Sequence, residues 1–385
     1  MIVIETVLLQ ILRIAVAVIV FGVIVVIHEG GHFAAAKAVG VQVNEFAIGM
    51  GPKLFSFGKK ETRYTVRLFP VGGFCAMEGE DAAGGGEVKL GKDKSLSDNP
   101  RAFNRKKVWQ RVLVTVAGAA MNLLLGFILL LVYFGTCTLP SNDGNIYYAG
   151  TQISRLEETT PAFQSGLRPG DTVLKIDNKR VFTVMDMQSL LQDSDDAVFT
   201  MQVRRKADGV EAVVTLPAVT FHREYSEELG AYQLNYDFYV NPIPQTIGST
   251  ITQSFKTECS VAVMVWRSLG NLITGKYGLN ELSGPVGTVG IIGDTVENAV
   301  QQENWQLGLG SVLMLVVLLT VNVGIFNLLP FPALDGGRLL FLAWEGITHK
   351  PVPQKYEGLV HGIGFALLLL LVLVVTFSDI FKIVS

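Results

Sequence analysis

The residues best suited to chemistry lie near the N-terminus, in the sequence His28-Glu-Gly-Gly-His32. On a helix, positions i and i+4 share a face, so both imidazoles can bind one metal ion. Zinc is the ion expected for two histidines with an open coordination position, and Glu29 between them can deprotonate a metal-bound water. The motif therefore predicts zinc-assisted hydrolysis, with His28 and His32 as ligands and Glu29 as general base.

This motif ends an apolar run, residues 14–33, which reads IAVAVIVFGVIVVIHEGGHF. In a soluble protein the same five residues are often accidental. Ionisable groups at membrane depth are costly, however, and by default they indicate a functional site. A purely structural role would require partners for three polar side chains on an apolar helix. We therefore favour metal binding, which needs a third protein ligand from elsewhere in the chain.

The third ligand is predicted in residues 327–338, which read NLLPFPALDGGR. Asp335 completes a set of two histidines and one carboxylate and leaves a fourth position for water. Pro330 and Pro332 prevent a regular helix, and broken backbone at membrane depth is tolerated where it is buried or lines a cavity. The alternative is that Asp335 caps a helix over residues 336–346.

Two asparagines in apolar segments are candidates for a supporting role. Asn327 can hydrogen-bond a substrate carbonyl or stabilise an oxyanion. Asn122 follows Gly118-Ala-Ala-Met, where small residues permit close helix packing. We expect Asn122 to bond a neighbouring helix; packing is the favoured role, with support of the metal as the alternative.

The composition is that of a membrane protein with several spans. The chain has 385 residues, 49% hydrophobic and 17% charged, with a mean hydropathy of +0.40. Soluble domains have about 25% charged residues. A net charge of -3 gives no overall basic signal, so nucleic acid is not expected as a partner. Cys75, Cys137 and Cys259 are far apart and predict neither disulfides nor a cysteine zinc site.

Four apolar segments have the length of a membrane span. They are residues 7–33, 108–134, 307–329 and 359–377. We interpret the N-terminal one as a retained span and not as a cleaved signal peptide. The loop after the first is basic and ends in Arg105-Lys106-Lys107, which predicts a cytoplasmic loop with both termini outside. Arg13 either reaches the interface or faces the protein interior. Residues 251–273 are predicted as an amphipathic helix, with a fifth span as the alternative.

The loop after the first span also has strand character. Residues 61–69, ETRYTVRLF, alternate and are rich in β-formers, and Gly49, Gly51 and Pro52 predict turns between short strands. The sequence Val71-Gly-Gly-Phe74 follows, so that Gly72 and Gly73 lie on a strand edge that can bind an extended peptide. A small structural sheet is the equal alternative. Residues 81–99 are rich in glycine and charge and predict a flexible loop.

Residues 142–220 have the character of a soluble, β-rich module. The run Gly166-Leu-Arg-Pro-Gly-Asp-Thr-Val-Leu-Lys-Ile-Asp177 resembles the signature of a PDZ domain. A short helix over 185–191 and a strand over 197–204 fit that pattern. The resemblance implies peptide binding by strand addition, and the alternative, which we favour, is that the domain only blocks access sterically.

The paired motifs His28-Glu-Gly-Gly-His32 and Asn327-x-x-Pro-x-Pro-x-x-Asp335-Gly, with a PDZ-like module between them, resemble the site-2 protease family, in particular its bacterial regulator-of-sigma-E type. The resemblance covers nearly the whole chain. It implies that His28, His32 and Asp335 bind zinc, that Glu29 is the general base and that Asn327 assists substrate binding. It also implies that the strands after the first span contact substrate.

The predicted fold class is a polytopic α-helical membrane protein with four transmembrane helices, a membrane-associated β element and an inserted extracytoplasmic PDZ domain. The first half is expected to contain a first span with HExxH (1–39), a cytoplasmic β region and loop (40–104), a second span (105–136) and the PDZ domain (137–222). It is expected to be followed by a region with an amphipathic helix (223–306), a third span with Asp335 (307–340) and a final loop and span (341–385).

The function expected from the resemblance is an intramembrane zinc endopeptidase of the bacterial cytoplasmic membrane. Its substrates would be transmembrane segments of single-span proteins, such as anti-sigma factors or signal-peptide remnants, and its other partner is the lipid bilayer. Two departures from the pattern are a single PDZ domain, where some relatives have two, and Ala119, where relatives often have proline. The alternatives are a membrane-anchored zinc protease that cuts soluble peptides and a non-catalytic scaffold.

Overall fold

The computed structural model describes residues 2–58, 61–80, 99–192, 197–207, 209–226, 231–276, 278 and 282–384. Most of the predicted flexible loop over residues 81–99 lies outside these ranges. The chain divides into two compact units, the first formed by Met1–Leu129 with Ser268–Ser385 and the second by Leu130–Arg267. The first unit contains both predicted metal-binding motifs.

Within the described residues, four helices are long and apolar enough to cross a membrane, in agreement with the four predicted spans. These segments are Gln10–Ala38, Val108–Thr136, Trp305–Asn327 and Lys355–Lys382. The helix over residues 247–273 is not among them, so a fifth span is not supported, and an amphipathic helix at the membrane surface stays a prediction.

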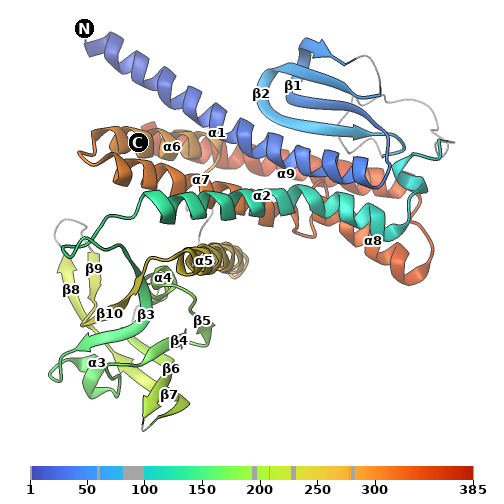
Figure 1. Cartoon of the computed structure of the whole chain (residues 1–385). Coiled ribbons are helices and arrows are strands. Elements are labelled where there is room, and N and C mark those ends of the chain that lie inside the picture. The colour runs from blue at the N-terminus through green and yellow to red at the C-terminus, as the bar shows by residue number, and fades with distance from the viewer. Residues whose placement is uncertain are drawn as a thin grey trace. The chain divides into compact units, whose positions relative to one another are not determined.

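The first unit is mainly helical, and Figure 1 shows its long helices running beside one another. Its helices are α1 (Ile2–Ala38), the 3-10 helix η1 (Phe103–Arg105), α2 (Val108–Thr136, whose last seven residues belong to the second unit), α6 (Pro285–Gln301), α7 (Trp305–Asn327), α8 (Asp335–Thr348) and α9 (Gln354–Val384).

The helix α1 continues beyond the HExxH motif to Ala38, so the motif lies inside the helix rather than at its end. Arg13 of α1 forms ion pairs with Asp294 and Glu297 of α6. Of the two expectations for Arg13, this contact supports the one facing the protein interior. Charged side chains on apolar helices are stabilised when they pair in this way.

The helix α7 ends at Asn327 because the two prolines that follow cannot continue it. The connection to α8 is an irregular turn in which Ala333 has a φ of +79°, a value that a residue with a side chain rarely adopts. The prediction of broken backbone before Asp335 is confirmed.

Two long antiparallel strands, β1 (Val43–Phe57) and β2 (Arg63–Met77), follow α1. The structure has these two bent strands where the sequence analysis expects short strands with turns, and Gly49 and Gly51 lie at the bends with positive φ. The part of β1 around residues 45–48 pairs with both ends of β2, at Arg63–Val66 and Gly73–Met77. The last part of β2 therefore forms one edge of the sheet in the described chain.

The second unit is built around a sheet with the strand order β10-β3-β4-β6-β7, with β5 paired to β4. Its elements are β3 (Tyr147–Leu156), α3 (Pro161–Gln164), β4 (Thr172–Ile176), β5 (Lys179–Arg180), α4 (Val184–Gln192), β6 (Val198–Ala207), β7 (Val210–Thr220), β8 (His222–Ser226), β9 (Ala231–Asn235), β10 (Phe238–Pro244) and most of α5 (Ile247–Ile273).

The core of this sheet contains Ile153, Leu167, Val173, Phe199 and Met201, each at most 1% exposed. The helix and strand predicted over residues 185–191 and 197–204 are found as α4 and β6. On β6 the buried residues Phe199, Met201 and Val203 alternate with more exposed ones, which explains why the sequence predicted a strand there.

Candidate metal centre

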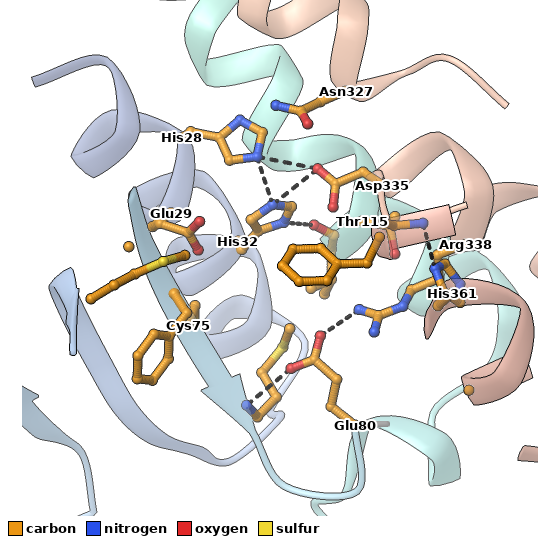
Figure 2. Close-up of a pocket in the computed structure, with 18 of the residues that line it drawn as sticks. His28, Glu29, His32, Cys75, Glu80, Thr115, Asn327, Asp335, Arg338 and His361 are labelled. Carbon is orange, nitrogen blue, oxygen red and sulfur yellow. Dashed lines mark hydrogen bonds and ion pairs between the residues drawn. The ribbon is translucent and has the colours of Figure 1, made fainter. Parts of the chain in front are cut away.

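Figure 2 shows that the three predicted metal-binding side chains converge on one point. Nε2 of His28 and Nε2 of His32 lie 3.2 Å apart, and each is 3.2 Å from Oδ2 of Asp335. Two motifs about 300 residues apart in the chain therefore meet. Asp335 Oδ2 is buried and has no hydrogen-bond partner among the described residues.

The spacing of these atoms fits a bound metal ion. Ligands of a tetrahedral zinc ion, at bond lengths of about 2.0–2.1 Å, lie about 3.3 Å apart. Two imidazole nitrogens and one carboxylate oxygen are also ligands that zinc prefers in proteins. The donor set and its geometry therefore suit zinc.

Helix α2 fixes the imidazole of His32. Nδ1 of His32 lies 2.8 Å from the backbone oxygen of Val114, which can only accept, so Nδ1 carries the proton and Nε2 presents its lone pair. Gly118 lies one turn further along α2. A Cβ added there would be 2.4 Å from Nε2 of His32 and 2.8 Å from Cε1 of His28. Only glycine at this position leaves room for both rings.

Asn122 lies a further turn along α2 and contacts the other histidine. It is completely buried, and its side-chain amide lies 3.3 Å from Nδ1 of His28. Its backbone oxygen accepts a hydrogen bond from Thr320 of α7, 3.1 Å away. Asn122 thus contacts the metal centre as well as packing between helices, so both expectations for this residue apply.

Asp335 does not cap helix α8. The residue at the N-cap is Leu334, no side chain bonds the first turn, and the carboxylate of Asp335 points to the imidazoles instead. Close packing holds this turn in place, because a Cβ on Gly336 would lie 2.0 Å from the backbone oxygen of Leu329. The alternative prediction, that Asp335 caps the helix α8, is therefore wrong.

A pocket of about 550 Å³ opens beside the three ligand atoms. Glu29 and Asn327 both line it, and Figure 2 shows Asn327 next to His28. Gly73 lines it too and lies against Glu29, since a Cβ on Gly73 would be 3.3 Å from Cγ of Glu29. Gly72 is not part of the pocket wall and instead lies against Met50. The structure therefore brings all the predicted site residues except Gly72 to one cavity.

The sequence analysis missed two charged residues of this wall, Glu80 and Arg338. They form an ion pair, and the Arg338 guanidinium also lies over the ring of Phe103. Burial raises the pKa of Glu80, and the neighbouring Arg338 opposes that rise. The pair joins the end of β2 to the first turn of α8, three residues after Asp335. Arg338 is adjacent to the Asp-Gly-Gly motif, which was the available signal; nothing marked Glu80.

Cys75 also lines the pocket, at the edge formed by β2. Burial raises the pKa of its thiol, so the nucleophilic thiolate is disfavoured. The thiol is thus suited to packing rather than to chemistry.

An HExxH helix whose two imidazoles meet a distant carboxylate, beside a cavity in the unit that contains the four apolar helices, is the arrangement expected of a membrane-embedded zinc metalloprotease. The sequence profile of peptidase family M50 matches residues 16–371, and the chain belongs to this family, the site-2 proteases.

Relatives cover nearly the full chain. The zinc metalloprotease RasP of Geobacillus kaustophilus is 32% identical, over 95% of this chain and 97% of its own length. RasP of Shouchella clausii is 30% identical, over 95% of this chain and 98% of its own length. The regulator of sigma-W protease RasP of Bacillus subtilis is also 30% identical, over 94% of this chain and 97% of its own length. The predicted zinc metalloprotease activity and the zinc cofactor are confirmed by this membership.

Proposed function

We propose that this protein is an intramembrane endopeptidase in which His28, His32 and Asp335 hold the zinc ion and Glu29 is the general base. The observation that supports this assignment most strongly is the 3.2 Å spacing of the three ligand atoms around one point. When bound there, zinc would polarise the scissile carbonyl and lower the pKa of a bound water.

The protein's own residues would then complete the reaction. Glu29, one residue after a ligand and in the same cavity, would accept the proton of the attacking water and pass it to the leaving amine. Asn327 would donate from its amide to the carbonyl oxygen of the substrate as negative charge develops. Neither step requires a residue from outside the first unit.

Asn122 would orient His28 in this site. Its Oδ1 is buried without a partner among the described residues, while its Nδ2 faces Nδ1 of His28. A half-turn of the amide places Oδ1 there instead, where it accepts the Nδ1–H proton and directs the lone pair of Nε2 to the metal.

The substrate would be the transmembrane segment of a single-span membrane protein. A helical segment must unwind before cleavage, because its carbonyls are otherwise engaged in helix hydrogen bonds. The edge of β2 at Gly73–Met77 lines the cavity at several positions and has strand partners on one side only in the described chain. It would hold the unwound segment extended by strand addition.

One relative is named as a regulator of sigma-W protease, which suggests anti-sigma factors, or signal-peptide remnants, as substrates here too. The protein would act in the bacterial cytoplasmic membrane. Its second unit would be an extracytoplasmic PDZ domain, since the basic loop before α2 predicts a cytoplasmic location for that loop.

The test is zinc content and cleavage of a single-span reporter protein in detergent by the wild type, Glu29→Gln and Asp335→Ala. The wild type is expected to cut within the apolar segment. Glu29→Gln should retain zinc without cutting, and Asp335→Ala should lose both. Cleavage by Glu29→Gln, or a wild type that holds no metal, would rule out this mechanism.

The two alternative functions make different predictions in the same assay. A surface protease would cut a soluble peptide carrying the same site at least as fast as the membrane-spanning reporter. A scaffold would cut neither. Accessibility labelling of a cysteine introduced beside Asp335 in intact membranes would additionally report the depth of the site.

A further inference from the structure

His361 of α9 forms part of the wall of the catalytic pocket but is not one of the proposed metal ligands. It is only 4% exposed, and Gly358, Gly362 and Phe365 of the same helix line the pocket beside it. Figure 2 labels it near Arg338, on the side of the cavity opposite Glu29. A histidine buried in an apolar helix requires hydrogen-bond partners for both ring nitrogens.

One ring nitrogen of His361 bonds the turn that presents Asp335. The backbone N–H of Ala333 donates to Nδ1 over 2.9 Å. Ala333 has the left-handed φ of +79° and lies two residues before Asp335. The backbone of α9 also packs closely here, since a Cβ on Gly364 would be 2.3 Å from Cβ of Pro332. His361 therefore stabilises an unfavourable conformation next to a metal ligand.

This bond determines where the proton of the imidazole resides. A backbone N–H can only donate, so Nδ1 must present its lone pair and the proton must be on Nε2. Nε2 is buried and has no hydrogen-bond partner among the described residues. His361 thus places a neutral N–H donor in the wall of the pocket, and no described residue accepts its hydrogen bond.

We propose that His361 is a substrate-binding residue whose Nε2–H donates to a backbone carbonyl of the unwound substrate, while Nδ1 holds the turn that positions Asp335. The proposal rests on the proposed cleavage of transmembrane segments. Such a segment carries apolar side chains, so its released backbone carbonyls are the acceptors it brings into the pocket. A neutral donor suits a carbonyl and avoids the burial of a second charge near Arg338.

The two nitrogens can be tested separately, because the amide of asparagine mimics Nδ1 and that of glutamine mimics Nε2. In His361→Asn, Oδ1 can accept the Ala333 N–H, but the donor to substrate is lost. We expect zinc affinity like that of the wild type, kcat within about twofold, and a KM about fivefold higher, the effect of one hydrogen bond. In His361→Gln we expect zinc affinity reduced about tenfold, because the support of a ligand is lost.

The experiment measures zinc affinity by competition with a chelator and cleavage of the single-span reporter in detergent, at saturating zinc. Substrate affinity is also measured in the Glu29→Gln background, where binding is separated from cleavage. His349→Asn, at an exposed histidine on the C-cap of α8, is the matched control and should leave zinc affinity, kcat and KM unchanged.

Failure of this proposal is distinguishable from failure of the proposed function. If the wild type does not cut the reporter, the function is wrong. If the wild type cuts and His361→Asn has the KM and substrate affinity of the wild type, the substrate-binding role is wrong. Loss of zinc in His361→Asn but not in His361→Gln would equally overturn the assignment of the two nitrogens.

Discussion

Asp335 in the first unit is half-buried with a buried Oδ2, Asp171 in the second unit is completely buried, and the surroundings of the two carboxylates are opposite. Asp171 accepts hydrogen bonds from Nε and Nη2 of Arg205, at 2.7 and 2.6 Å, and from the backbone N–H of Arg168. Oδ2 of Asp335 is directed at two imidazole nitrogens and accepts no hydrogen bond from the described residues.

This difference separates a structural carboxylate from one that is arranged for a ligand. The charge of Asp171 is neutralised within the protein, by a guanidinium that joins β4 to β6. The carboxylate of Asp335 pairs with two imidazoles rather than with a guanidinium, an arrangement that suits a bound cation. The first arrangement should contribute to stability and the second to activity, and the following experiments test that division.

The largest effect is expected for Asp335→Ala. Cleavage should fall by about a thousandfold or more, because the metal and its activated water are lost. The melting temperature of the zinc-free protein in detergent should change little, since among the described residues the carboxylate of Asp335 pairs only with the two imidazoles. A large fall in that temperature would contradict the comparison, because it would make Asp335 a structural residue.

The opposite result is expected for Arg205→Met in the second unit. It leaves the charge of Asp171 buried and unpaired, which should lower the free energy of unfolding of this unit by about 3 kcal/mol. Hydrogen exchange of the β4 and β6 amides in the full-length protein should accelerate by about a hundredfold. Zinc content should be unchanged, and Arg204→Met, at the exposed neighbour, is the control. Zinc loss in Arg205→Met alone would show that the two carboxylates are not independent.

An intermediate effect is expected for Gly118→Ala in α2. The added methyl group would overlap both imidazoles and force them apart, so zinc affinity should fall about 10- to 100-fold. Alanine otherwise favours a helix, so the fold should be retained. Gly135→Ala in the same helix, where a Cβ meets nothing within 4 Å, is the matched control. Equal zinc affinities in the two variants would mean that the α1–α2 packing does not hold the ligands.

The smallest effect is expected for Glu258→Gln in α5, which tests a third kind of carboxylate. Burial raises the pKa of Glu258 to about 7 from an ordinary 4.5. Its contribution to stability is therefore complete below about pH 4.5 and is lost as the pH rises to about 7, where the folded state also ionises. The glutamine variant stays neutral and should gain up to about 1 kcal/mol over the wild type above pH 7, a value kept small by solvent screening.

Unfolding of both proteins by denaturant from pH 4 to 8 measures this difference. The exposed Glu211→Gln serves as control and should follow the wild type at every pH. Parallel curves for Glu258→Gln and the wild type would show that Glu258 is solvated in the folded protein.

The sequence by itself determined the four apolar spans, the HExxH helix, the broken segment before Asp335 and the strands of the second unit. These features can be predicted from local sequence, because the hydropathy of a segment, the restricted backbone of proline and the i, i+4 spacing on a helix each involve residues close together in the chain. The prediction of Asp335 as third ligand also came from the sequence, because two histidines need one further protein ligand to form a zinc site.

Only the tertiary structure decided which residues support the site. Asn122 and Gly118 lie at the site because α2 packs against the two imidazoles, whereas the sequence favoured helix packing as the role of Asn122. The Glu80–Arg338 pair and the bond from Ala333 to His361 join residues far apart in the chain, and no local pattern marks such contacts. Hydrogen bonds and close packing between separate helices are set by their arrangement in space, which a single sequence does not record.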